Sequence, residues 1–226
     1  MILAAGQGKR MLPLTANTPK PLLRAAGKTL LEYQLERLQQ AGINEVLINV
    51  AYLGQQIIDF VGDGSAWGMR ITVSEEPYAL ETGGALAMAL PWFEGEAFVL
   101  LNADVWCELD YKKFVATGLP KGKLAHLLMV PNPDFHKAGD FALLDNGDLI
   151  LAEEGLDLAL TYAGIAIMSP ELIAGYPERR QKFPLREVFD YAIPKALFSA
   201  ELYAGDWRDI GCPERLLELD RDLSVC

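Results

Sequence analysis

Short apolar strands alternate with helical patterns along the first hundred residues, and this alternation restricts the fold more than any other feature of the chain. Strand-like runs are expected at 2–5, 45–50, 69–73 and 97–101, with helical patterns near 30–41, 53–61 and 84–90 between them. Strands joined through helices form parallel pairs with right-handed crossovers. The pattern therefore predicts an α/β fold, with a Rossmann-like, mostly parallel sheet and helices on both faces.

Three local signals define element boundaries. Thr29 and Glu32 have the spacing of a capping box at the start of the first helix. Pro91 is expected to stop the helix that begins at 84, because proline lacks the backbone N–H that a helix interior needs. Asn146-Gly147 predicts a two-residue hairpin turn between strands at 141–144 and 148–151.

The second half of the chain has a different pattern, which predicts a smaller β-rich lobe. We expect a single domain over residues 1–226, in which this lobe covers the edge of the sheet. The further elements expected are strands at 124–130, 162–168 and 197–203 and helices at 184–193 and 213–223. Acidic residues on the last helix, at 214, 218, 220 and 222, are interpreted as a solvated face.

Charge is distributed unevenly. The chain of 226 residues has 20 basic and 31 acidic side chains and a net charge of −11, which argues against a general binder of nucleic acid or anionic membranes. The first 31 residues nevertheless contain five basic residues and no acid, so this segment alone carries +5. A basic, glycine-containing segment on an acidic chain indicates a local site for an anion.

Several protein classes are excluded by composition. Three scattered cysteines without CxxC spacing are typical of reduced thiols, and they predict a cytoplasmic protein. The two histidines do not have the spacing of a metal-ligand pair. No apolar run reaches the roughly 18 residues of a membrane span, and the opening five apolar residues do not make a signal peptide. We expect no membrane partner and no nucleic-acid partner.

The glycine-rich segment after the first strand is the strongest candidate site. Backbone amides at Gly6 and Gly8 could converge on phosphate oxygens, with Lys9 and Arg10 beside them. The segment matches neither the dinucleotide-binding fingerprint nor the Walker A motif. A simple tight turn would explain the glycines alone. Lys20, however, stands between Pro19 and Pro21, which restrict the backbone on both sides of it. Together with the glycine-rich turn, this rigid lysine favours a phosphate contact.

These residues resemble the signature of the sugar-1-phosphate nucleotidyltransferases. The motifs occur in the family's order over essentially the whole chain, and they are Leu3-Ala-Ala-Gly6-x-Gly8-x-Arg10-Met11, Pro19-Lys20-Pro21, Leu80-Glu81-Thr82-Gly83-Gly84, Asn102-Ala103-Asp104 and Trp207-Arg208-Asp209-Ile210-Gly211. The resemblance implies a nucleotide-diphospho-sugar transferase fold, with a nucleotide-binding half at about 1–110 and a sugar-binding half at about 111–226.

Within the family, the details resemble the bacterial N-acetylmuramate 1-phosphate uridylyltransferases of peptidoglycan recycling. The shared segments include Tyr52-Leu53-Gly54-Gln55-Gln56-Ile57, Gly62-Asp63-Gly64-Ser65, Gly139-Asp140-Phe141 and Gly164-Ile165. The implied reaction is transfer of UMP from UTP to N-acetylmuramate 1-phosphate, dependent on Mg²⁺. The implied partners are the nucleoside triphosphate and the sugar 1-phosphate, and the protein would be a monomer or small homo-oligomer.

The resemblance also implies roles for particular residues. Arg10 and Lys20 would be catalytic, and Asp104 and Asp209 would share one Mg²⁺, although sequence spacing alone cannot bring together two acids that are 105 residues apart. The nucleotide would contact Ala4, Gly6, Gly8, Thr82 and Gly83. Thr82 also has a plain structural interpretation as a helix N-cap. The sugar would contact Asp140, Glu153, Thr161 and Gly164.

One departure from the family pattern affects the sugar site. Many relatives have Glu-Lys-Pro where this chain has Glu153-Glu154-Gly155, so the lysine is missing. Lys137 or Arg186 could take its place, and His136 could reach the sugar or simply lie exposed in a loop. The alternatives left open are guanylyl transfer to a mannose or heptose 1-phosphate, thymidylyl or uridylyl transfer to a glucose 1-phosphate, and a non-catalytic nucleotide-sugar-binding module.

Overall fold

The computed structural model describes residues 1–152 and 159–225. The chain divides into two compact units, and each unit is built from more than one segment of the sequence. Unit 1 comprises Met1–Ala79, Leu101–Lys113 and Asp206–Cys226, and unit 2 comprises Leu80–Leu100 and Phe114–Gly205. None of the described helices is long and apolar enough to cross a bilayer.

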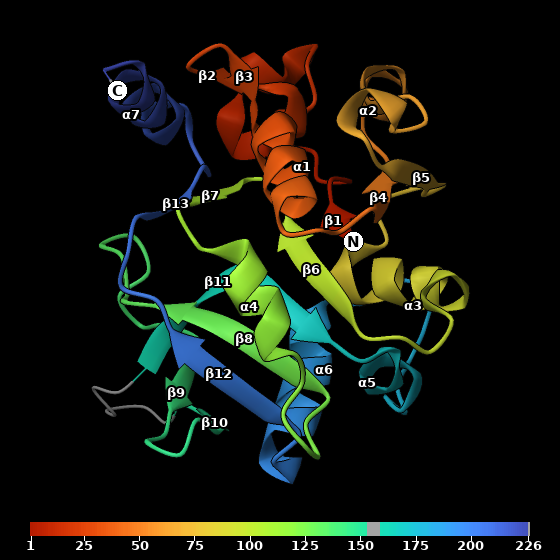
Figure 1. Ribbon diagram of the computed structural model, residues 1–226, viewed down its shortest axis with the longest axis vertical. Helices are drawn as coiled ribbons and strands as arrows, with labels where there is room; N and C mark the ends of the chain where they lie inside the picture. The colour runs from red at the N-terminus through yellow and green to blue at the C-terminus, as the bar shows by residue number, and fades with distance from the viewer. Residues whose placement is uncertain (153–158, 226) are drawn as a thin grey trace. The chain divides into compact units, whose positions relative to one another are not determined.

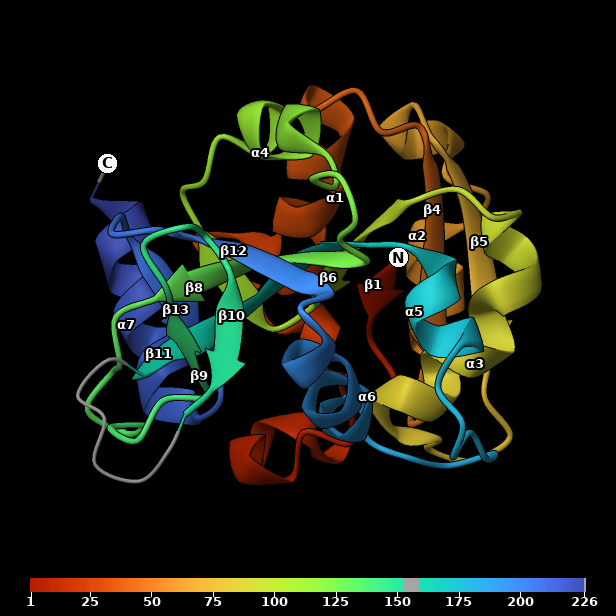
Figure 2. The ribbon, with the colours of Figure 1, turned by 90° about the horizontal axis from the view of Figure 1, so that it is seen from below.

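Unit 1 is built on parallel strands. β1 (Ile2–Leu3) pairs in parallel with β4 (Glu45–Val50) on one side and with the last two residues of β6 (Phe98–Asn102) on the other. β4 also pairs in parallel with β5 (Arg70–Glu75), and Figure 2 shows these two strands side by side. The carboxyl ends of β1, β4 and β5 therefore share one edge, where ligands bind in open α/β sheets.

The helices of unit 1 begin close to where the sequence places them. In α1 (Leu30–Gln40), the Glu32 amide donates to Thr29 Oγ1 and the Glu32 carboxylate accepts from the Thr29 amide, so the predicted capping box is confirmed. Leu31, Leu35 and Leu38 form the buried face of α1. α2 (Gly54–Val61) follows β4 and packs against β5.

Two short antiparallel ribbons and the last helix complete unit 1. The ribbons are β2 (Arg24–Ala25) with β3 (Lys28–Thr29), and β7 (Val105–Cys107) with β13 (Trp207–Asp209). α7 (Pro213–Ser224) packs against β2 (Figure 1). A hydrophobic cluster joins these parts, and its buried members are Met11, Leu23, Ala25, Leu30, Trp106, Ile210, Leu216 and Leu219.

Unit 2 contains the β-rich part of the chain, as predicted. Its strands are β8 (Ala125–Val130), β9 (Phe141–Leu143), β10 (Leu149–Leu151), β11 (Ala159–Met168) and β12 (Phe198–Leu202). β11 is antiparallel to both β8 and β9, whereas β12 is parallel to β8 and lies beside it (Figure 2). The α/β class and the largely parallel character of the unit 1 sheet agree with the sequence prediction.

The helices of unit 2 include α3 (Glu81–Phe93), α5 (Pro170–Ala174) and α6 (Leu185–Ala192), and α3 contacts both others. α4 (Tyr111–Thr117) follows β7 and crosses the boundary of the units. Short 3₁₀ turns occupy the connections, at Lys9–Met11, Leu14–Ala16, Lys20–Leu22, Ser65–Trp67 and Ile193–Lys195.

Two local predictions were wrong. Pro91 does not stop its helix but lies inside α3, which continues to Phe93. A proline one turn from a helix end removes only one backbone hydrogen bond, so the last turn can still form. The 141–151 hairpin has a three-residue loop rather than a two-residue turn, since the Leu144 amide donates to the Asp148 carbonyl. Gly147, with φ of +84°, provides the left-handed conformation in this loop.

The capping box of α1 gives a test of local stability. Thr29→Ala removes the acceptor for the Glu32 amide, which is 3.0 Å away, and should lower the free energy of unfolding by about 1 kcal/mol. Urea denaturation followed by circular dichroism measures the change. An unfolding midpoint equal to that of the wild type would show that the cap contributes nothing.

Candidate active site

Buried polar side chains fix the start of the glycine-rich loop. The Ala4 amide donates to Asn49 Oδ1 at 3.0 Å, and Asn49 Nδ2 donates to Glu76 Oε1 at 2.7 Å. Both side chains belong to largely buried residues at the carboxyl ends of β4 and β5. The Ala4 amide, which was predicted to contact the nucleotide, is thus engaged within the protein. Sequence reasoning missed Asn49 and Glu76, although polar residues ending apolar strands were a visible signal.

Gly8 is required by close packing. Its φ is +60°, and a Cβ added there would lie 2.9 Å from Thr15 Cγ2 and 3.2 Å from Lys20 Cβ. The buried Thr15 hydroxyl donates to the Gly8 carbonyl at 2.8 Å. These contacts draw the 15–20 segment back over the glycine loop, so Gly8 brings Lys20 near the loop that bears Arg10.

Gly6 differs from Gly8 because the fold does not require it. Its φ is not positive, and a Cβ built there would meet nothing within 4 Å. Arg10 is exposed, and its side chain makes no ion pair or hydrogen bond with the described residues. An open backbone segment beside an uncommitted guanidinium is suited to an anionic ligand.

Side chains at and just before the start of α2 hold the 15–17 segment by hydrogen bonds. The Tyr52 hydroxyl donates to the carbonyls of Thr15 and Ala16 at 3.0 and 3.1 Å, and Gln56 Nε2 donates to the Asn17 carbonyl at 3.0 Å. The sequence marked the 52–57 segment only as a point of resemblance to the family. In the structure, this segment supports the neighbouring loop. It holds the loop that bears Arg10 and Lys20.

The pairing of β7 with β13 brings together two acids that are far apart in the sequence. Asp209 is the register partner of Val105, and the Ile210 amide donates to the Asp104 carbonyl at 2.9 Å. Gln34 Nε2 donates to the Val105 carbonyl from α1, which supports the ribbon. Asp104, directly before β7, and Asp209, the last residue of β13, are therefore joined through the backbone of one short ribbon.

Each of these carboxylates has its own cationic partner. Lys20 Nζ contacts Asp104 Oδ2, and Arg215 NH1 donates to Asp209 Oδ2 at 2.8 Å. The side chains of Asp104 and Asp209 are 31% and 23% exposed, so both remain partly open to solvent. The sequence predicted the first cation, Lys20, but it gave no reason to select Arg215.

The donor set suits a magnesium ion that also binds substrate. Mg²⁺ prefers oxygen ligands and is usually held by one or two carboxylates together with substrate phosphates and water. The described residues contain no group of three or more His, Cys, Asp or Glu that could hold a metal alone. Asp104 and Asp209, with one carboxylate each, suit an ion whose coordination is completed by phosphates and water.

In unit 2, Gly83 is explained by packing rather than by a ligand. A Cβ there would lie 2.5 Å from the Phe183 ring, and the neighbouring Gly84 amide donates to the Phe183 carbonyl at 3.1 Å. Thr82 lies inside α3, whose N-cap residue is Leu80, so the interpretation of Thr82 as an N-cap was wrong. The close approach of the 181–183 segment is a tertiary contact that the sequence does not reveal.

Two of the predicted sugar-binding residues, Thr161 and Asp140, make hydrogen bonds between the 132–140 segment and β11. Thr161 is buried and donates to Asn132 Oδ1 at 2.9 Å, while Asn132 Nδ2 donates to the Ala159 carbonyl at 2.7 Å. Asp140 Oδ2 accepts from the Tyr162 amide at 2.8 Å, and its Oδ1 lies 3.1 Å from His136 Nε2. These hydrogen bonds tie the 132–140 segment to β11.

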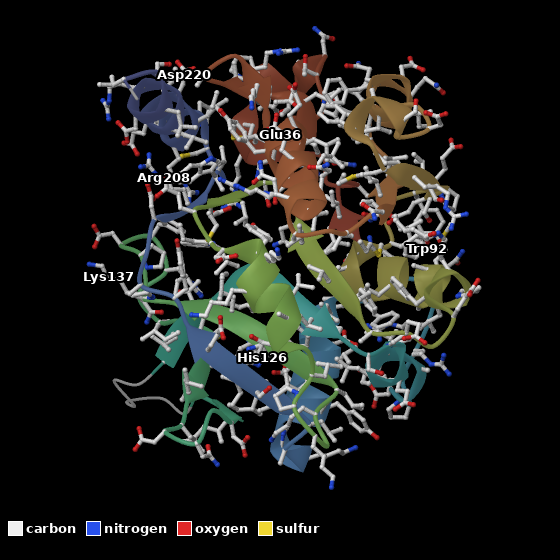
Figure 3. The ribbon with its side chains drawn as sticks, viewed as in Figure 1. Glu36, Trp92, His126, Lys137, Arg208 and Asp220 are labelled. Carbon is white, nitrogen blue, oxygen red and sulfur yellow. The ribbon has the colours of Figure 1, made fainter. Side chains whose placement is uncertain are left out.

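The remaining candidates for the sugar site are placed as follows. Gly164 has φ of +74° where the register of β11 shifts, so the backbone there favours glycine. Glu153 lies outside the described residues. Arg186 is exposed, pairs with Asp190 at 2.7 Å and lies 4.8 Å from the centre of the Phe141 ring. Lys137, on the 132–140 segment, is labelled in Figure 3.

The contrast between Gly6 and Gly83 gives a matched pair of substitutions. Gly6→Ala should leave the thermal midpoint nearly unchanged and weaken nucleoside triphosphate binding, because the new methyl group enters only the open side of the loop. Gly83→Ala should destabilise the protein by 1–3 kcal/mol, a cost typical of overpacking. Thermal denaturation and calorimetric titration measure both effects. Equal destabilisation by the two substitutions would contradict this distinction.

Comparison with known proteins places the chain in a family. Residues 1–141 match the profile of the family described as Nucleotidyl transferase. The chain is 42% identical over 221 residues to the N-acetylmuramate alpha-1-phosphate uridylyltransferase of Neisseria meningitidis serogroup B, covering 96% of this chain and 95% of that protein. It is 31% identical to the mannose-1-phosphate guanylyltransferase catalytic subunit beta of Drosophila melanogaster, covering 96% of this chain and 60% of that protein.

A solved structure extends the similarity to three dimensions. HddC from Yersinia pseudotuberculosis, complexed with GMP-PN, has a TM-score of 0.79 and 29% identity, with 98% of this chain and 97% of that chain covered. The similarity in sequence and in fold thus extends over nearly the whole length of the chain. This chain belongs to the nucleotidyl transferase family and has its nucleotide-diphospho-sugar transferase fold.

Proposed function

We propose that this chain transfers UMP from UTP to N-acetylmuramate 1-phosphate, giving UDP-N-acetylmuramate and pyrophosphate. The observation that carries the proposal is the β7–β13 ribbon, which joins Asp104 to Asp209 in the same unit as the open glycine loop. The choice of substrates is supported by the uridylyltransferase that is 42% identical over nearly the full length of both chains.

The proposed chemistry is an in-line displacement at phosphorus. An oxygen of the sugar 1-phosphate forms a bond to the α-phosphorus of UTP, and the bond from that phosphorus to the bridging oxygen of the β-phosphate breaks. The electron pair leaves with pyrophosphate. The attacking phosphate is already largely deprotonated near neutral pH, so no protein group has to remove a proton. Catalysis then depends on positioning and on neutralising charge.

The basic residues of unit 1 would perform most of this task. Arg10 is exposed beside Gly6, so its guanidinium can bind the β- and γ-phosphates together with the loop amides. Lys20 has only 11% of its side chain exposed and lies against Asp104. Its ammonium group is therefore held next to one of the two proposed metal ligands, where it would stabilise the charge at the α-phosphate or on the attacking phosphate.

Asp104 and Asp209 would hold the metal. Mg²⁺ bound there would neutralise negative charge on phosphate oxygens and help to orient them. The backbone of both acids is held by the β7–β13 register and by the hydrogen bond from the Ile210 amide to the Asp104 carbonyl. Mg²⁺ is the ion proposed because carboxylate oxygens and substrate phosphates are the ligands that it usually takes.

The base and sugar contacts stay predictions. Thr82 and Gly83 remain candidates for the nucleotide, and Asp140, Glu153, Thr161 and Gly164 for the sugar. The hydrogen bonds of Asp140 and Thr161 are made within unit 2, so we expect these two residues to act through the shape of the 132–140 segment. A monomer or small homo-oligomer in the cytoplasm also stays a prediction.

Guanylyl transfer to a mannose-type 1-phosphate is the second candidate. It is favoured by the 31% identity to a mannose-1-phosphate guanylyltransferase subunit and by the guanosine compound in the HddC structure. Both candidates would use the same phosphate chemistry, and only the base and the sugar differ.

A grid of substrates separates these possibilities. Pyrophosphate release should be fastest with UTP and N-acetylmuramate 1-phosphate, compared with GTP, dTTP and the 1-phosphates of glucose and mannose. A chelator such as EDTA should abolish release, and added Mg²⁺ should restore it. Turnover with GTP alone would overturn the uridylyl assignment, and no turnover with any pair would favour a non-catalytic binding module.

Lys20 provides the sharpest test of the catalytic assignment. Lys20→Ala should reduce kcat by at least about a hundredfold, the scale expected when a preorganised charge-stabilising donor is removed. Lys28→Ala is the matched control, because Lys28 lies in the same basic segment but is exposed and pairs with Glu36 at 2.7 Å. Steady-state kinetics with folded variants measures both. Retention of more than a tenth of wild-type kcat by Lys20→Ala would contradict the assignment.

A further inference from the structure

Arg215 makes a direct contact with one of the two proposed metal ligands. Its NH1 atom donates to Asp209 Oδ2 at 2.8 Å, and 19% of the Arg215 side chain and 23% of the Asp209 side chain are exposed. Arginine stays protonated at all physiological pH values, and its planar donors fix the orientation of a carboxylate. The charge that holds the Asp209 carboxylate is therefore present throughout the physiological pH range.

The helix that carries Arg215 is itself anchored in unit 1. Leu216 and Leu219 of α7 are buried in the hydrophobic cluster that includes Ile210. Asp220 accepts from the Ala26 amide at 2.8 Å, and Asp222 accepts from Arg208 of β13 at 2.7 Å. Figure 3 labels Asp220 on α7 and Arg208. The sequence analysis interpreted Asp220 and Asp222 as part of a solvated face. In the structure, both carboxylates accept hydrogen bonds from other elements of unit 1. They fix α7 against the strands beside it.

Gly211 is an independent sign of how closely Arg215 approaches Asp209. A Cβ at Gly211 would lie 2.4 Å from Arg215 NH2 and 2.9 Å from Asp209 Oδ2. The φ of Gly211 is not positive, so its backbone conformation does not call for glycine. The space that a side chain would fill is the space that the arginine occupies.

The contact divides the two oxygens of Asp209 between different tasks. Oδ2 accepts a hydrogen bond from Arg215, whereas Oδ1 accepts none within the described part of the chain. Without the arginine, the carboxylate could rotate about its side-chain bonds and present either oxygen. With it, Oδ1 remains the oxygen available to a cation.

We propose that Arg215 is a positioning residue that holds Asp209 so that Oδ1 faces the metal. The proposal rests on the proposed function, because it takes Asp209 as a metal ligand. Arg215 touches no substrate in this scheme and acts only through Asp209. Residues that hydrogen-bond to a metal ligand without touching the metal typically strengthen metal binding, and their removal weakens it by about 10- to 100-fold.

Metal binding without substrate provides the main test. Mn²⁺ is titrated with the whole protein, and the free ion is followed by electron paramagnetic resonance. Arg215→Met should weaken Mn²⁺ binding about tenfold, and Arg215→Lys should recover part of the loss because it restores one charged donor. Arg221→Met is the matched control on the same helix, since Arg221 is 71% exposed and pairs with Asp222 instead.

Gly211→Ala is a second route to the same effect. The added methyl group should displace the guanidinium, so this variant should weaken Mn²⁺ binding as Arg215→Met does. Wild-type Mn²⁺ affinity in Gly211→Ala would contradict the proposal. This variant also covers the case in which Arg215→Met does not fold.

Kinetics and a ligand mutant separate the possible failures. In Arg215→Met, the Mg²⁺ concentration for half-maximal rate should rise about tenfold, while kcat at saturating Mg²⁺ stays within a few-fold of wild type. If Asp209→Asn binds Mn²⁺ as well as the wild type does, the metal site of the proposed function is wrong. If Asp209→Asn loses Mn²⁺ but Arg215→Met keeps wild-type affinity, only the role of Arg215 is overturned.

Discussion

The pairing of β7 with β13 is the contact on which the candidate active site depends. The ribbon is short, yet it joins the residues after β6 to the C-terminal part of the chain and places Asp209 opposite Val105. Gln34 of α1 supports it from one side, and Ile210 anchors it in the hydrophobic cluster. Strand pairing fixes backbone positions, so the two acids are held together before any ligand arrives.

The charges around this ribbon are nearly balanced. Lys20 contacts Asp104 and Arg215 contacts Asp209, so each partly buried acid has a cation beside it. Arg10, in contrast, is exposed on the glycine loop. The basic character of the first 31 residues thus serves two purposes. One part compensates carboxylates within the protein, and another part remains for an anionic ligand.

The structure requires the glycines of the family motifs for different reasons, and it does not require all of them. Gly8 is needed by a positive φ and by contacts with Thr15, and Gly83 by contact with Phe183. Gly6 meets no such demand, and the space beside it stays open. A glycine that the fold itself does not need is the better candidate for close approach of a ligand. This distinction depends on three-dimensional contacts and cannot be made from a motif.

The sequence by itself determined the α/β class, the capping box of α1, the basic loop and the family resemblance, because periodicity, caps and local charge are properties of neighbouring residues. It could not determine which distant side chains meet. The pairing of Asp104 with Lys20, the restraint of Asp209 by Arg215 and the network of Asn49 and Glu76 all join separate segments. Only the tertiary structure decided these contacts, since strand register and helix docking set them rather than spacing along the chain.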